Sequence, residues 1–245
     1  MDRLIYTALT GLSARSRSQA VTANNLANAQ TTGFRREIIN AHGRYLTGGM
    51  VASRAQTGAS SVATPQEPGK IAATSRPLDV AMGGNAWLVI QGPVVNGKAT
   101  EAYTRRGDLE VGISGVLQNG DGKAILNADG VPVTVPPGAE LSIAADGGLS
   151  VRVGAVDTDI GRLKLVAGRG LEKGADGMFT ASQPLPVDPA ARLATGMLEG
   201  ANVQTAGALV ELVEEARGFE VNVRLLTIAK DMDERTARLM SLDSN

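Results

Sequence analysis

The chain has 245 residues, enough to bury a sizeable core as one large domain or two small ones, and its formal net charge of −1 gives no global sign of a nucleic-acid or anionic-membrane partner. Cysteine is absent, which excludes disulfides and thiolate chemistry. The N-terminal stretch lacks a basic region followed by an apolar core, and no apolar run approaches the roughly 20 residues that cross a bilayer, so we expect neither a cleaved signal peptide nor a membrane span.

The N-terminal region is predicted to be a helix, because its side chains follow a heptad spacing of alternating steps of four and three. The seam is apolar at its ends and polar in the middle, at Ser16 and Gln19. Its members are Ile5, Leu9, Leu12, Ser16, Gln19, Ala23 and Leu26.

The end of this helix carries three amides, Asn24, Asn25 and Asn28, followed by Gly33 and Phe34. Asn is a mediocre helix former, but its amide donates and accepts hydrogen bonds without carrying charge. The last turn of a helix leaves backbone carbonyls without intrahelical partners. The residues alone fit two interpretations, amides that satisfy such groups at a crowded junction or an ordinary polar helix end.

The middle of the chain is predicted to be β-rich and antiparallel. All ten prolines lie between Pro65 and Pro189, and most glycines share that part of the chain, which is typical of short strands and turns. Asn-Gly and Asp-Gly dipeptides, which favour tight hairpin turns, separate segments of alternating apolar residues. These dipeptides begin at Asn96, Asn119, Asp121, Asp129, Asp146 and Asp176. Before them, Val51 to Ala73 is predicted to be extended linker.

The C-terminal region, from about Thr205 to Ser241, is predicted to be a second long helix with its own heptad seam. At 1.5 Å per residue it would be roughly 55 Å long, more than a core of this size covers. We therefore expect the seam to meet other helices, with packing on its own domain as the alternative. The seam consists of Leu209, Leu212, Ala216, Phe219, Val223 and Leu226.

No pattern for catalysis, metal binding or a cofactor is found. His42 is the sole histidine and has no nearby ligand partners, so it is predicted to be a loop residue. A calcium-loop-like run at Asn119 lacks the bidentate Glu at its twelfth position, which is Gly130. We therefore expect no enzymatic activity, no metal, no cofactor, no small-molecule substrate and no nucleic acid.

Several blocks resemble the bacterial flagellar rod and hook family of axial proteins, most closely its proximal-rod members. Ala23 to Asn28 followed by Thr31 to Arg36 resembles the family's N-terminal signature. Further blocks occur in the family's order over most of the chain: Arg76 to Ala81, Ala102 to Gly107, Gly196 to Val203, and Ala216 to Glu220. Gly218 and Phe34 depart from the family pattern, which usually has a larger residue and Tyr there.

The resemblance implies an α+β fold in which long N- and C-terminal helices pair as a coiled-coil-like domain around a central, antiparallel β-rich domain. Residues 1–35 and 200–245 would form the helical inner wall of a hollow tube, 36–70 an extended linker and 71–199 the β-rich domain. The amides would then lie at a crowded helix junction, and Gly33 would permit the turn toward the β-rich domain. Residues expected in subunit packing are Ile5, Leu9, Leu12, Asn24, Asn25, Leu26, Asn28, Gly33, Phe34, Leu209, Leu212, Ala216, Phe219, Val223 and Leu226.

The implied function is that of a structural subunit of the proximal rod, which polymerises with copies of itself and other rod proteins and transmits torque. The resemblance also implies passage through the flagellar export apparatus, without a cleaved signal, to the periplasm-spanning rod of the basal body. The nearest alternatives are the distal rod or the hook. An alternative from another class is a secreted protein acting on peptidoglycan or carbohydrate, which requires a carboxylate pair that Glu101, Glu110 and Glu140 do not form in any recognisable pattern.

Overall fold

The computed structural model describes residues 2–40, 43–45, 55–57, 61–95, 97–174 and 176–242. It contains two helices, α1 (Asp2–Ala27) and α2 (Thr205–Leu242). The strands are β1 (Ile38–Asn40), β2 (Gly43–Tyr45), β3 (Ala55–Thr57), β4 (Ser61–Ala63), β5 (Ile71–Ala73), β6 (Val80–Met82), β7 (Ala86–Val95), β8 (Lys98–Thr104), β9 (Leu109–Val111), β10 (Leu117–Asn119), β11 (Glu140–Ile143), β12 (Gly148–Val153), β13 (Val156–Arg162), β14 (Leu165–Ala167), β15 (Glu172–Lys173), β16 (Phe179–Thr180), β17 (Leu193–Thr195) and β18 (Met197–Glu199). His42, predicted to be a loop residue, and Asn96, predicted to be in a turn, lie outside the described residues.

The predicted fold class, α+β with long terminal helices paired as a coiled-coil-like domain, is wrong. The described residues form eighteen strands in seven small sheets and only two helices, so the chain is strand-rich. The apolar side chains of the two predicted seams are also not all buried within the chain: Leu9, Leu209 and Val223 are 46%, 48% and 42% exposed. Between residues 8 and 27 of α1, the buried side chains are Thr22 and Asn25, which are polar and lie outside the predicted heptad seam.

The chain divides into two compact units. The first comprises Met1–Ala29, Arg36–Pro65 and Val203–Asn245, and the second comprises Gln30–Arg35 and Gln66–Asn202. The segment 36–70, expected to be an extended linker, contains β1 to β4, which pair as β1 with β4 and β2 with β3. Ile38, Ile39 and Val62 lie in the first of these pairs, where β-branched side chains favour extended backbone.

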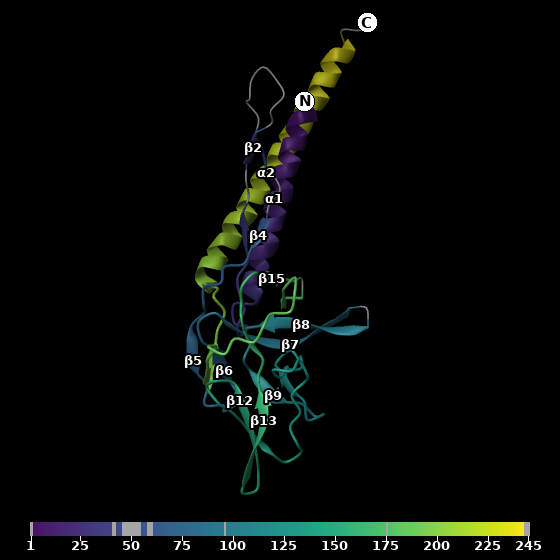
Figure 1. The fold of residues 1–245 in the computed structure, drawn as a ribbon. Helices are drawn as coiled ribbons and strands as arrows, with labels where there is room; N and C mark the ends of the chain where they lie inside the picture. The colour runs from purple at the N-terminus through teal and green to yellow at the C-terminus, as the bar shows by residue number, and fades with distance from the viewer. Residues whose placement is uncertain are drawn as a thin grey trace. The chain divides into compact units, whose positions relative to one another are not determined.

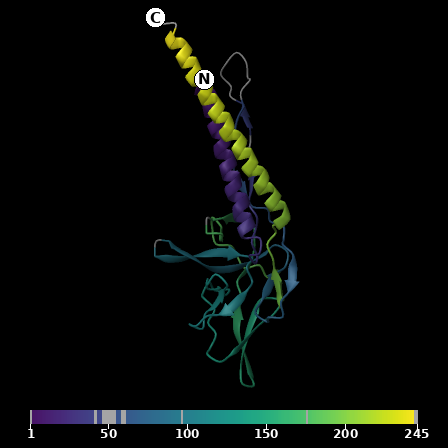
Figure 2. The ribbon, with the colours of Figure 1, turned by 180° about the vertical axis from the view of Figure 1, so that it is seen from behind.

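In the first unit, α1 and α2 lie side by side and run in opposite directions (Figures 1 and 2). The contact involves polar groups: the hydroxyls of Ser18 and Thr22 donate hydrogen bonds to Glu215. Among the described residues of this unit, the only apolar side chains that are fully buried are those of Ala208 and Ala229. The part of this unit that the structure describes therefore has almost no apolar core. Neither helix, as far as it is described, is apolar enough to cross a membrane.

The second unit contains the apolar core of the chain. Its largest sheet has the strand order β14-β7-β8-β16-β15, with the long β7–β8 hairpin visible in Figure 1. One apolar cluster gathers around Leu88, Ile90 and Leu117, and a second around Trp87 and Phe179, whose ring centroids lie 4.6 Å apart. All strand pairs in the described residues are antiparallel.

Candidate assembly surfaces and the helix-end junction

One of the three amides, Asn28, donates a hydrogen bond to a backbone carbonyl in the last turn of α1. The backbone carbonyl of Asn24 accepts hydrogen bonds from the backbone N–H of Asn28 at 3.1 Å and from its side-chain Nδ2 at 2.9 Å. The same Nδ2 lies 3.0 Å from Oδ1 of Asn24. The side chain of Asn28 therefore adds a donor to a carbonyl of the last helical turn, where intrahelical donors run out.

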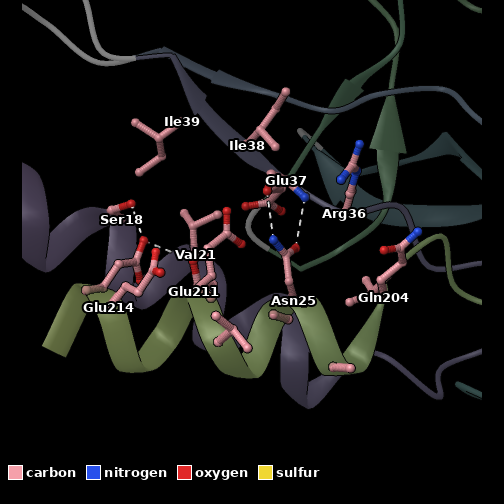
Figure 3. Close-up of a pocket in the computed structure, with 17 residues that line it drawn as sticks. Ser18, Val21, Asn25, Arg36, Glu37, Ile38, Ile39, Gln204, Glu211 and Glu214 are labelled. Atoms are coloured by element: carbon pink, nitrogen blue, oxygen red, sulfur yellow. Dashed lines mark hydrogen bonds between the residues drawn. The ribbon is translucent and has the colours of Figure 1, made fainter.

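A second amide, Asn25, ties α1 to the chain that leads into β1. Its Nδ2 donates to the backbone carbonyl of Glu37 at 2.7 Å, and its Oδ1 accepts from the backbone N–H of Glu37 at 2.9 Å (Figure 3). Asn25 is buried, and this pair of bonds satisfies both ends of its amide. An ionised carboxylate cannot donate a hydrogen bond, and an aliphatic side chain can neither donate nor accept one. Asn suits this position because its amide does both.

Between α1, α2 and β1 lies a cavity of about 670 Å³ (Figure 3). Ser18 and Thr22 of α1 line it and donate to Oε1 of Glu215, the first at 2.5 Å and the second at 3.2 Å. Glu211 and Glu214 line the α2 side, so the lining is rich in carboxylates. No group of three or more metal-binding side chains occurs among the described residues, so the cavity offers no recognisable metal site.

In the second unit, Gly33 occupies a position that no other residue fits. Its φ is +68°, and a Cβ built there would lie 2.4 Å from the carbonyl carbon and oxygen of Arg105. Its N–H donates to the carbonyl of Glu199 at 2.7 Å. The next residue, Phe34, accepts from the N–H of Asn202 at 3.2 Å and carries the Lys173 ammonium 4.0 Å from its ring centroid.

A buried ion cluster lies beside Gly33. Glu199, at the end of β18, is fully buried, as are Arg35 and Arg105. Oε2 of Glu199 accepts from Nε and Nη2 of Arg105 at 2.8 and 2.5 Å. Oε1 lies 2.6 Å from Nη1 of Arg35 and accepts from the N–H of Gly69 at 2.9 Å. We call Arg35, Arg105 and Glu199 the junction cluster.

The junction cluster holds together segments that are far apart in the sequence. The Arg105 guanidinium also donates to the carbonyls of Met82 and Ala86, and burial lowers the pKa of this group, an effect that the Glu199 carboxylate opposes. Arg35 is the last residue before the chain leaves the second unit, and Glu199 is three residues before it leaves again. The cluster therefore fixes, within the second unit, the ends of the segments that continue into the helices.

The apolar residues predicted to take part in subunit packing differ in how far they are buried. Ile5 lies in α1, but its side chain is outside the described residues. Leu9, Leu209 and Val223 are exposed. The half-buried members are Leu12, Leu26, Leu212, Ala216, Phe219 and Leu226. Their part in subunit packing stays a prediction.

The sequence interpretation missed the junction cluster. Arg105 and Glu199 were noted only as members of two separate blocks, because 94 residues separate them and opposite charges alone do not identify partners. Glu199 lies between Leu198 and Gly200, which is a weak local signal for burial, whereas Arg105 lies between Thr104 and Arg106 and carries no such signal.

Comparison with known proteins identifies the family. A family model described as "Flagella basal body rod protein" matches residues 5–35, and one described as "Flagellar basal body rod FlgEFG protein C-terminal" matches residues 194–239. The chain is 36% identical over 256 residues to the flagellar basal-body rod protein FlgF of Salmonella typhimurium, covering 99% of this chain and 100% of that protein. The chain belongs to the flagellar basal-body rod protein family. The FlgF of Escherichia coli K12 matches with the same identity and coverage, so the chain is a structural rod protein of the FlgF type.

A more distant member of the rod family is the FlgG of Bacillus subtilis, which is 26% identical over 271 residues, with 98% of this chain and 99% of that protein covered. The N-terminal match contains most of α1, the three amides, Gly33 and Arg35, and the C-terminal match contains Glu199 and most of α2.

Proposed function

We propose that the chain polymerises through α1 and α2, with copies of itself and with other rod proteins, into a hollow helical tube that transmits torque. The role is structural and non-enzymatic, and the place is the proximal, periplasm-spanning part of the rod. The distal rod and the hook remain the alternatives; the FlgF type is favoured because the FlgF proteins of S. typhimurium and E. coli match at 36% identity and the FlgG of B. subtilis at 26%.

One observation carries this proposal. In the described part of the first unit only two apolar side chains are buried, those of Ala208 and Ala229, while large apolar side chains of α2 such as Val210 and Ile228 are exposed. Helices gain most of their stability from packing rather than from propensity. A helix that is apolar on more than one face is normally buried. The first unit therefore needs partners outside its own chain.

We also propose that the chain travels through the flagellar export apparatus with its N-terminus intact. A signal peptide of the usual length, about 15 to 30 residues, would include most of α1. Removal of 25 or more residues would delete Ser18, Thr22 and Asn25, the side chains that bond α1 to α2 and to the start of β1, and a shorter cleavage would still remove more than half of α1. Mass spectrometry of the chain from purified basal bodies should recover the peptide that begins at residue 1 or 2.

The decisive experiment combines deletion of the gene with complementation. Deletion should abolish motility, the wild-type chain should restore it, and the chain should be present in purified basal bodies. Phe219→Asp places a carboxylate at a half-buried site of α2 and should abolish motility while the second unit stays folded, since burying an unpaired charge costs several kcal/mol. Thr227→Asp, which puts the same charge on an exposed site of the helix, is the matched control and should leave cells motile.

Absence of the wild-type chain from purified basal bodies, or normal swimming after deletion, would overturn the proposal. Robust hydrolysis of peptidoglycan by the purified protein would overturn its non-enzymatic part.

A further inference from the structure

The chain passes between its two compact units four times, after Ala29, Arg35, Pro65 and Asn202. Three short segments of the second unit adjoin these passages: residues 30–35, 66–70 and 199–202. We call these three segments the collar. Every collar contact described below lies within the second unit.

Segment 199–202 forms the middle of the collar, and its backbone is hydrogen-bonded to segment 30–35. The N–H of Gly33 donates to the carbonyl of Glu199 at 2.7 Å, and the N–H of Asn202 donates to the carbonyl of Phe34 at 3.2 Å. These two bonds lie at opposite ends of segment 199–202, so they hold it along its length.

Segment 199–202 is also bonded to segment 66–70. The N–H of Gly200 donates to the carbonyl of Lys70 at 2.8 Å, and Nδ2 of Asn202 donates to the carbonyl of Glu67 at 3.0 Å. A Cβ built on Gly69 would lie 1.9 Å from the carbonyl oxygen of Gly200, so the two backbones approach too closely for any side chain at Gly69.

The junction cluster joins the three collar segments through one carboxylate. Oε1 of Glu199 accepts from the N–H of Gly69 at 2.9 Å and lies 2.6 Å from Nη1 of Arg35. Glu199 and Arg35 are both buried, so removing one from the other would leave a charge buried without compensation. The collar segments are therefore difficult to separate.

Several connections held at fixed separations have a mechanical property that a single connection lacks. Each residue of a single connecting strand rotates about φ and ψ, so such a strand transmits a pull but little twist. Strands whose ends are bonded side by side cannot turn about a common axis without breaking the bonds between them. A subunit that carries torque needs connections of the second kind.

We propose that the collar is the element through which each subunit passes torque between its two units. The inference rests on the proposed function and adds the part of the fold that carries the load. Weakening the collar without unfolding the second unit should therefore spare assembly and impair rotation under load.

The test uses two glycines of the collar that differ in the room for a methyl group. Gly69→Ala forces segments 66–70 and 199–202 apart, because the added Cβ collides with the Gly200 carbonyl. Gly200→Ala is the matched control, because the nearest atom to its added Cβ, the carbonyl oxygen of Lys70, lies at an ordinary contact distance of 3.5 Å. Each variant is expressed in a strain that lacks the gene, and its presence in purified basal bodies is verified. Denaturation followed by the fluorescence of Trp87 verifies that the second unit is folded.

Rotation of single motors is measured with small and large beads attached to the filaments, which impose low and high viscous loads. We expect Gly69→Ala motors to turn small beads at the wild-type speed, whereas the fraction of motors that keeps turning a large bead falls several-fold. Gly200→Ala should match the wild type with both beads. A defect in folding or export would instead reduce the number of motors that turn either bead.

Asn202→Ala is a second, milder variant, which removes the side-chain bond to Glu67. Its control is Gln118→Ala, which removes an exposed side-chain bond to Glu110 outside the collar. We expect a smaller loss with large beads for Asn202→Ala and no loss for Gln118→Ala.

Gly69→Ala motors that turn large beads as wild-type motors do would overturn the inference and leave the proposed function standing. If Gly69→Ala is absent from basal bodies, normal rotation of large beads by Asn202→Ala would overturn it instead. Equal losses in Gly69→Ala and Gly200→Ala would also overturn it, since the added methyl group would then act without the collision. Absence of the wild-type chain from basal bodies would overturn the proposed function itself.

Discussion

Glu199 connects three segments of the second unit that are far apart in the sequence. It is a lone carboxylate between two buried guanidinium groups, those of Arg35 and Arg105, and it also accepts the N–H of Gly69. A buried ion pair is weak support for stability as a whole, because desolvation of the charges offsets their attraction. Removing one partner is a different matter, since the remaining charges then stay buried without compensation.

We predict that Glu199→Ala destabilises the second unit by about 3–5 kcal/mol, because Arg35 and Arg105 are left buried without a counter-charge. Chemical denaturation of the full chain, followed by the fluorescence of Trp87, measures the loss. The matched control is Asp157→Ala, which breaks the exposed ion pair with Arg152 and should leave the unfolding midpoint nearly unchanged. Equal effects of the two substitutions would contradict a structural role for the junction cluster.

Gly33 gives a second test at the same scale. Alanine in the left-handed region costs about 1–2 kcal/mol, and at Gly33 its Cβ would in addition collide with the Arg105 backbone. Gly33→Ala should therefore destabilise the second unit clearly more than Gly122→Ala. Gly122 has a similar φ of +71°, but no atom lies within 4 Å of its added Cβ. The same denaturation measurement compares the two, and equal losses would refute the close approach of the Arg105 backbone.

At the scale of elements, α2 illustrates how a helix can serve two partners. One side contacts α1 through hydrogen bonds to Glu215. Elsewhere on the helix large apolar side chains are exposed, among them Val210, Val221 and Ile228. Gly218 lies on the side toward α1, where a Cβ would come within 2.3 Å of the Arg15 guanidinium. That neighbour is the flexible end of a long side chain rather than backbone, so it can move away.

We predict that Gly218→Ala is tolerated and raises helix stability by up to about 1 kcal/mol, with Arg15 displaced. Gly11→Ala on α1, where no atom lies within 4 Å of the added Cβ, is the matched control and should give a similar gain. Circular dichroism and thermal unfolding of the full chain measure both. If Gly218→Ala alone destabilises the protein or blocks its incorporation into basal bodies, the space above Gly218 is required for packing.

The elements also show what the sequence could predict and why the rest escaped. Both helices follow from their heptad spacing and from the scarcity of Gly and Pro at the chain ends, and the role of Asn28 follows from the chemistry of a helix end. The heptad seam of α1 leaves out Thr22 and Asn25, which are buried, because their side chains are polar and carry no apolar signal. The pairing of Arg105 with Glu199 depends on the folded course of the chain between them, which local patterns do not encode.

For the whole molecule, the contrast between the two units is the main physical fact. The second unit has two apolar clusters of its own, whereas the described part of the first unit fully buries only two alanines. Local stability follows buried apolar contacts, so the two units should differ strongly in how often they open. A chain of this kind would gain its helical order when α1 and α2 pack against neighbouring copies.

Hydrogen exchange on the verified monomer and on purified rods, read by mass spectrometry, tests this claim most directly. We predict that peptides of β7, β8 and β14 are protected in both samples, whereas peptides of α1 and α2 exchange rapidly in the monomer and become protected in the rod. Peptides of α2 between Val210 and Ile228, where large apolar side chains are exposed, should show the largest gain. If α1 and α2 are as protected as β7 in the free monomer, the helices are stable without neighbours and ordering on assembly is contradicted.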